Sequence, residues 1–141
     1  LLVRVEKDFV FYLANFANAD MMAHTGNMDA TVEGLKVIDQ CLKKIASTVL
    51  SNPDYELVIT CDHGNCEEVI DPATGGSDTQ HSTANVIAVF ASQSLAHEPD
   101  GRSLDTLAAE APVGSLIDIA PTIVKLFGYE KPIEMTGSPL I

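Results

Sequence analysis

The stretch Leu57-Val58-Ile59-Thr60-Cys61-Asp62-His63-Gly64-Asn65 joins a short apolar run to a cluster of polar side chains. Residues 57–61 are typical of a buried β-strand, since the run is continuous, β-branched and followed by turn residues. Asp62 and His63 therefore come just past the carboxyl end of a strand, where open α/β sheets place their binding sites. A charged pair buried at such an edge needs a compensating partner, so these two residues are the first candidates for a functional site.

Apolar patterning predicts regular structure on both sides of this stretch. Further strands are expected at 9–13 and 86–90, and helices at 29–50 and 118–127. Through 29–50 the apolar residues recur at steps of three or four, and Asn27 or Asp29 can cap that helix. Gly128 can end the last helix, and residues 93–113 are expected to form a loop.

The alternation of strands and helices predicts an α/β fold in which parallel strands are covered by helices. Three strands leave an edge and much of one face of such a sheet uncovered. The chain is therefore expected to be part of a larger domain, and nothing inside it has the composition of an inter-domain linker.

Composition narrows the class of partner. The 141 residues include 8 Lys and Arg against 20 Asp and Glu, for a formal charge of −12. This excess of acid argues against a nucleic acid or an anionic membrane as partner, because both bind basic surfaces. The sequence has no apolar run of the roughly 18 residues that a membrane span needs, and residues 1–8 lack a signal-peptide pattern. Three cysteines without a CxxC pair predict neither a disulfide framework nor a structural zinc site, which favours a reducing cytoplasm.

Three of the four histidines fall in the loops expected at strand ends, and two of them accompany an aspartate. His24 follows Asp20 by four residues, His63 follows Asp62 directly, and His81 precedes the third strand. Imidazole and carboxylate together suit zinc, manganese or iron, and such pairs converging from separate loops can form a two-metal site for phosphoryl transfer.

Simpler interpretations of these residues stay open at this point. Asp20 can equally cap the following helix, and His24 and His81 can be solvated loop residues. His97 is assigned no role. The glutamate pair 67–68 is interpreted as a solvated acidic face.

Two segments carry a resemblance to a known family. Residues 15–27, which contain Asp20-Met-Met-Ala-His24-Thr-Gly26, resemble the NxxxxDMVGHTG segment of the cofactor-independent phosphoglycerate mutases, members of the alkaline-phosphatase-like superfamily. Residues 59–68 resemble the family's ITADHGNxE segment. The similarity continues in the family's order through 70–75, 79–81, 115–124 and 134–137. The related phosphopentomutases share Asp-His-Gly-Asn, but not the His-Thr-Gly after Asp20 or the Glu-Met-Thr-Gly ending.

The resemblance implies a fold and a metal site. The fold would be an alkaline-phosphatase-like three-layer α/β/α sandwich with a mainly parallel sheet, of which residues 1–141 would be the C-terminal part of the phosphatase domain. Two divalent metal ions are implied, commonly manganese, with zinc, magnesium or cobalt as alternatives. By this similarity Asp20, His24 and His81 would hold one ion. Asp62 and His63 would belong to the shell of the other.

The resemblance also implies a reaction for the complete protein. It would interconvert 3-phosphoglycerate and 2-phosphoglycerate through a phosphoserine, as a cytoplasmic and monomeric enzyme of glycolysis and gluconeogenesis. Neither a nucleic acid nor a membrane partner is expected.

Parts of the family's machinery are expected outside this chain. The nucleophilic serine and a further aspartate ligand lie upstream in the family, and the substrate-binding arginines belong to a separate transferase domain. No catalytic residue is therefore predicted in this chain, which alone should lack mutase activity and is expected to self-associate through its incomplete sheet.

Two alternative functions stay open for the chain: a water-using metallo-phosphatase, and a non-catalytic metal-binding module that complements a second chain. Met22-Ala23 replaces the family's Val-Gly.

Overall fold

The computed structural model describes residues 11–95 and 101–141, which belong to two compact units. The first unit spans Leu1–Leu95 and the second Ala96–Ile141. The first contains the helices α1 (Asn18–Ala23) and α2 (Met28–Val49), the strands β1 (Leu57–Thr60) and β2 (Ala88–Ala91), and the 3-10 turn η1 (Cys66–Glu68). The second contains α3 (Leu104–Ala109), the 3-10 turn η2 (Leu116–Asp118) and α4 (Ile119–Leu126).

Helix α2 confirms the long amphipathic helix that the sequence predicts. The side chain of Asn27 caps it by accepting a hydrogen bond of 3.1 Å from the backbone N–H of Ala30. Thr31 is almost completely buried within its first turns. Twenty-two residues of regular apolar spacing, together with a side-chain cap, are a strong local signal for a helix.

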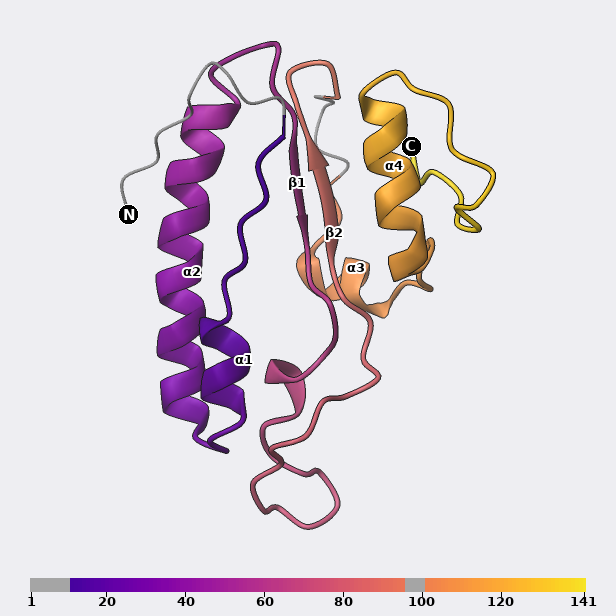
Figure 1. Cartoon of the computed structure of the whole chain (residues 1–141). Helices are drawn as coiled ribbons and strands as arrows, with labels where there is room; N and C mark the ends of the chain where they lie inside the picture. The colour runs from indigo at the N-terminus through magenta and orange to yellow at the C-terminus, as the bar shows by residue number, and fades with distance from the viewer. Residues whose placement is uncertain (1–10, 96–100) are drawn as a thin grey trace. The chain divides into compact units, whose positions relative to one another are not determined.

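Helix α1 was not predicted, and it lies against α2 in Figure 1. Close packing of the two helices depends on small residues. Ala23 is fully buried, and a methyl group at Gly34 of α2 would lie 3.3 Å from Cγ of Met22. At six residues α1 is too short to show a helical period, and packing on α2 stabilises it instead.

Strands β1 and β2 pair antiparallel, with Leu57 opposite Ala91 and Thr60 opposite Ala88. The parallel pairing expected from the order of elements is therefore wrong for this pair. The reason lies in the connection. Residues 61–87 contain one turn of 3-10 helix and no crossover helix, so the chain returns alongside β1 instead of passing over the sheet. The third strand also begins two residues later than predicted.

The strand predicted at 9–13 is not confirmed. Residues 11–13 have no regular structure, and residues 9 and 10 lie outside the described part of the chain. An apolar run becomes a strand only when a neighbouring strand accepts its backbone hydrogen bonds. Within residues 11–95, β1 and β2 pair with each other.

The loop between β1 and β2 is folded back on itself and reaches the end of α1. Bridges pair Gly64 with Ser82 and Ile70 with Ser77, and Val69 between them is fully buried. The hydroxyl of Ser77 donates to the carbonyl oxygen of Gly26 at 3.1 Å. Gly26 has φ +66°, and a methyl group there would lie 2.6 Å from Cβ of Ser77, so this contact requires glycine.

In the second unit, α4 confirms the predicted last helix, whereas α3 corrects the expectation of a loop over 93–113. Ser103 caps α3 by accepting from the N–H of Thr106 at 3.1 Å, and serine at this position is a local sequence signal for the start of a helix. After α4, the N–H of Gly128 donates to Lys125 and that of Tyr129 to Val124. This is the Schellman pattern that ends helices at glycine.

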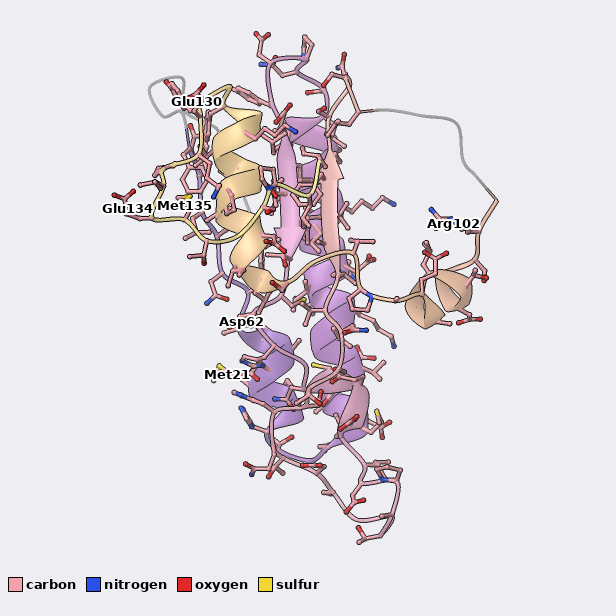
Figure 2. All side chains as sticks on the ribbon, turned by 90° about the vertical axis from the view of Figure 1, so that its right-hand side faces the viewer. Met21, Asp62, Arg102, Glu130, Glu134 and Met135 are labelled. Atoms are coloured by element: carbon pink, nitrogen blue, oxygen red, sulfur yellow. The ribbon has the colours of Figure 1, made fainter. Side chains whose placement is uncertain are left out.

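The carboxylate of Asp118 joins the start of α4 to the C-terminal segment. It accepts the backbone N–H of Ser115 at 2.8 Å and that of Ser138 at 2.7 Å. Figure 2 shows Glu130, Glu134 and Met135 on the loop after α4, and Arg102 beside α3. None of the described helices combines the length and the apolar character needed to cross a membrane.

Candidate metal centre

Helix α1 presents two of the predicted ligands from consecutive turns. Asp20 lies within the helix and His24 is its C-terminal cap, four residues later. Nε2 of His24 lies 3.4 Å from Oδ1 of Asp20. The two residues were expected in a loop. The helix explains their spacing better, because positions i and i+4 share one helix face.

His81 joins this pair from a distant part of the sequence. Its Nε2 lies 3.4 Å from Oδ1 of Asp20 and 3.1 Å from Nε2 of His24. Among the residues that the structure describes, these three are the group whose potential ligand atoms converge. The antiparallel return of the chain brings His81 beside α1.

The three atoms have the spacing of ligands around one divalent ion. Tetrahedral zinc with bonds of about 2.0–2.1 Å places its ligands about 3.3–3.4 Å apart. An octahedral ion with bonds of about 2.1 Å places neighbouring ligands about 3.0 Å apart. The observed separations of 3.1, 3.4 and 3.4 Å match this range, so the residues fit a metal.

The hydrogen bond of the His24 ring also suits a metal ligand. Its Nδ1 lies 2.7 Å from the backbone oxygen of Thr79. A carbonyl oxygen only accepts, so Nδ1 carries a hydrogen, and in the neutral imidazole Nε2 is then the nitrogen whose lone pair faces Asp20 and His81. Metal-bound histidines usually donate their other ring N–H in this way, which fixes the ring.

His63 and Asp62 lie at the margin of this cluster. The ring of His63 stacks on that of His81, with centroids 3.6 Å apart and an angle of 19° between the planes. Nε2 of His63 lies 3.7 Å from Oδ2 of Asp62, whose side chain is 86% exposed just past the end of β1 (Figure 2). The structure thus brings all five predicted residues into one neighbourhood. Asp62 and His63 supply only two ligand atoms of their own.

Asn65 was quoted within the sequence motif but assigned no role. Its side chain is 4% exposed, and its Nδ2 donates to Oδ1 of Asp20 at 2.7 Å. This hydrogen bond is the main reason that the pKa of Asp20 lies below its ordinary value. Partial burial opposes the shift, and the imidazoles of the cluster, His24, His63 and His81, reinforce it.

Glu67 is exposed, as the sequence predicts, but it is engaged in the loop. Its carboxylate accepts the hydroxyl of Ser82 and, at 3.0 Å, the backbone N–H of Asn65. Burial acts to raise the pKa of Glu67, but these hydrogen bonds outweigh it and the pKa lies below its usual value. Gly64 is buried between them, and a methyl group there would collide with Ser82 and Glu67.

Comparison with known proteins places the chain in a family. A family model described as the metalloenzyme superfamily matches residues 2–131. The chain belongs to this superfamily. The cluster of two histidines and one carboxylate at metal-ligand spacing agrees with the description of this superfamily as metalloenzymes.

Curated relatives of the chain carry a more specific name. The 2,3-bisphosphoglycerate-independent phosphoglycerate mutase of Rhodopirellula baltica is 38% identical over 129 residues, covering 92% of this chain and 22% of that protein. The enzyme of the same name from Clostridium beijerinckii is 40% identical over 142 residues, covering 100% of this chain and 25% of that protein. The resemblance drawn from the motifs is confirmed. The chain spans about a quarter of the length of these relatives.

A solved structure confirms the fold class for this metalloenzyme-superfamily chain. Leishmania mexicana phosphoglycerate mutase, solved at low cobalt concentration, matches with a TM-score of 0.66 and 28% identity. The match covers 88% of this chain and 23% of that one. The helices and the antiparallel strand pair described above are thus a portion of an alkaline-phosphatase-like sandwich.

Proposed function

We propose that this chain is the C-terminal part of the phosphatase domain of a cofactor-independent phosphoglycerate mutase. In this proposal Asp20, His24 and His81 hold one divalent metal ion. The observation that supports it most directly is the convergence of their three ligand atoms within 3.4 Å of one another. The names of the curated relatives support the assignment of the reaction.

The residues of the chain have distinct tasks in this proposal. Asp20 contributes an anionic oxygen and the two imidazoles contribute neutral nitrogens, a donor set suited to manganese, zinc or cobalt. The carbonyl of Thr79 keeps the lone pair of His24 Nε2 directed at the site. When bound, a divalent ion supplies positive charge that offsets the charge of a phosphate group.

Asp62 and His63 belong to a second metal site that needs further ligands from outside the chain. They offer one carboxylate and one imidazole, with ligand atoms 3.7 Å apart and Asp62 largely exposed. In the complete protein, the resemblance assigns the remaining ligands and the nucleophilic serine to upstream segments. The complete enzyme would interconvert 3-phosphoglycerate and 2-phosphoglycerate in the cytoplasm with manganese as the preferred ion. The chain alone is proposed to lack this activity.

Calorimetric titration of the chelator-treated chain with Mn²⁺ tests the metal site. Wild-type protein should bind about one ion in a tight phase, and His81→Ala should abolish that phase because it removes one of three ligands. His97→Ala is the matched control, since the sequence assigns that histidine no role. A tight phase that survives in His81→Ala would show that the ligand assignment is wrong.

A complementing module is a second candidate, favoured by the small apolar core. Among the described residues, Ala23 and Val69 are the hydrophobic side chains that are fully buried, whereas Val32, Leu35 and Val37 of α2 are each at least 40% exposed. Such apolar faces need a covering partner. Co-expression with an upstream segment of a relative should yield a stable complex, and sedimentation should show the isolated chain self-associating. A chain that sediments as a monomer and forms no complex with the upstream segment would contradict this role.

A further inference from the structure

Asn65 is the most deeply buried polar side chain at the metal centre. It is 4% exposed, and its Nδ2 lies 2.7 Å from Oδ1 of Asp20. Its Oδ1 is buried without a hydrogen-bond partner among the described residues. One end of this amide is thus hydrogen-bonded, and the other end has no partner among the described residues.

The orientation of the amide follows from chemistry. An ionised carboxylate only accepts hydrogen bonds, so the atom 2.7 Å from Asp20 must be the NH₂ group. The reverse orientation would place two oxygens against each other. The carbonyl end therefore has no hydrogen-bond partner within the described part of the chain, which costs folding free energy.

Stability of the fold does not explain this arrangement. An apolar side chain of the same branched shape would fill the space without burying an unpaired oxygen, and the Asp20 side chain, which is 37% exposed, could accept from water in place of Asn65. A buried polar group without a partner in a native protein calls for an explanation, and a role in a functional site is one such explanation. The interaction that Asn65 does make is the hydrogen bond to Asp20.

That hydrogen bond reaches the carboxylate oxygen that faces both imidazoles. Oδ1 of Asp20 is the atom measured at 3.4 Å from His24 and at 3.4 Å from His81. A carboxylate oxygen has lone pairs for two partners, so one can accept from Asn65 while another faces a cation. The Asp20 side chain is 37% exposed, and this contact restrains its rotation.

Asn65 is itself held rigidly by its backbone. Its N–H donates to the carboxylate of Glu67 at 3.0 Å, and its carbonyl accepts the N–H of Glu68 at 3.1 Å. These bonds do not involve the side chain. Substitution of the side chain therefore leaves the anchoring of the loop intact.

We propose that Asn65 is a positioning residue that fixes the Asp20 carboxylate so that Oδ1 faces the metal together with His24 and His81. This inference rests on the proposed metal site. Because the N–H preorganises a ligand and does not itself bind the ion, its loss should weaken binding without abolishing it.

The test separates metal affinity from folding with Asn65→Leu, which keeps the branched shape and removes the N–H. We expect Mn²⁺ binding about tenfold weaker or more by calorimetry, and a changed visible absorption spectrum with Co²⁺ as probe. The melting temperature of the metal-free protein should change little, because removal of the unpaired buried oxygen offsets the lost hydrogen bond to the partly exposed Asp20. Asn85→Leu makes the same change at an exposed position and should alter none of these readings.

The outcomes distinguish this inference from the proposed function. If wild-type chain binds no Mn²⁺, the proposed metal site fails. If wild type binds and Asn65→Leu binds within twofold with the same Co²⁺ spectrum, the positioning role fails and the site stands. Asn65→Ala provides a second variant with the same expected loss of affinity. Failure of both variants to fold without metal would overturn the inference, because the side chain would then be needed for folding.

Discussion

The imidazole of His63 stacks on that of His81, with the ring centroids 3.6 Å apart, although the two residues are proposed to bind different metal ions. The stacking joins a complete set of three ligands to an incomplete set of two. Because a site with fewer protein ligands gives less binding free energy, the two ions should bind with unequal affinity.

Asp62→Asn should expose this inequality. The tighter phase of Mn²⁺ binding should stay within about twofold of wild type, because Asp62 is not among the three converging residues. The weaker phase should lose about tenfold in affinity or disappear, since an amide oxygen is a poorer ligand than a carboxylate. Calorimetry on chelator-treated protein measures both phases. If Asp62→Asn abolished the tighter phase instead, Asp62 would be a ligand of the tighter site and our assignment would be wrong.

Gly26→Ala should damage both stability and metal binding. Gly75→Ala is a matched control, because Gly75 has a similar φ of +70° but open space where a methyl group would lie. Each variant should lose about 1 kcal/mol for the left-handed backbone. Gly26→Ala should lose about 1–3 kcal/mol more, because its methyl group meets Ser77.

The expected effect of Gly26→Ala on metal affinity follows from the position of Ser77 in the loop that carries Thr79. Displacement of Ser77 shifts Thr79, whose carbonyl orients His24 at 2.7 Å. Gly26→Ala should therefore weaken Mn²⁺ binding, whereas Gly75→Ala should not. Urea unfolding and calorimetry give the two readings. Equal losses of stability in both variants would show that the close approach to Ser77 has no energetic effect.

Replacing Glu67 and Glu68 together by Gln should leave Mn²⁺ affinity within a few-fold, because neither belongs to the converging ligands. Glu67→Gln alone should lower the free energy of unfolding by about 1 kcal/mol, since one of its two acceptors becomes an NH₂ group. Glu68→Gln serves as the control and should change little. An affinity loss as large as that of His81→Ala would make one glutamate a ligand.

Asp118 should make the second unit sensitive to acid. The backbone N–H groups of Ser115 and Ser138 hold the pKa of Asp118 below its ordinary value of 3.8. A depressed pKa in the folded state means that this stabilisation is fully present above pH 3.8 and is lost as the pH falls through the lower folded value. Asp118→Asn should thus lower the melting temperature at pH 7 by more than at pH 3. Asp39→Asn on α2 is the control, and an equal effect at both pH values would contradict the argument.

Local sequence signals predicted the elements that local forces stabilise. Helix α2 has many turns of apolar periodicity and the Asn27 cap, and α4 ends at a glycine with φ +75°. Helix α1 has neither length nor a side-chain cap, and it depends on contact with α2. The direction of β2 depends on how residues 61–87 return, which no short pattern records.

The candidate site shows the same division. Asp20, His24, Asp62, His63 and His81 were predictable because each is a metal-binding residue type within a recognisable motif. The roles of Asn65 and of the Thr79 carbonyl were not predictable. Asn65 is 45 residues from Asp20 in sequence and Thr79 is 55 residues from His24, so these contacts exist only in the folded chain.

The separation of 57 residues between His24 and His81 also sets an order of events during synthesis. Asp20 and His24 emerge from the ribosome long before His81. The three-ligand set is complete only after the loop following β1 has folded back against α1. An ion held by all three residues therefore requires this long-range contact, and its binding couples the loop after β1 to α1.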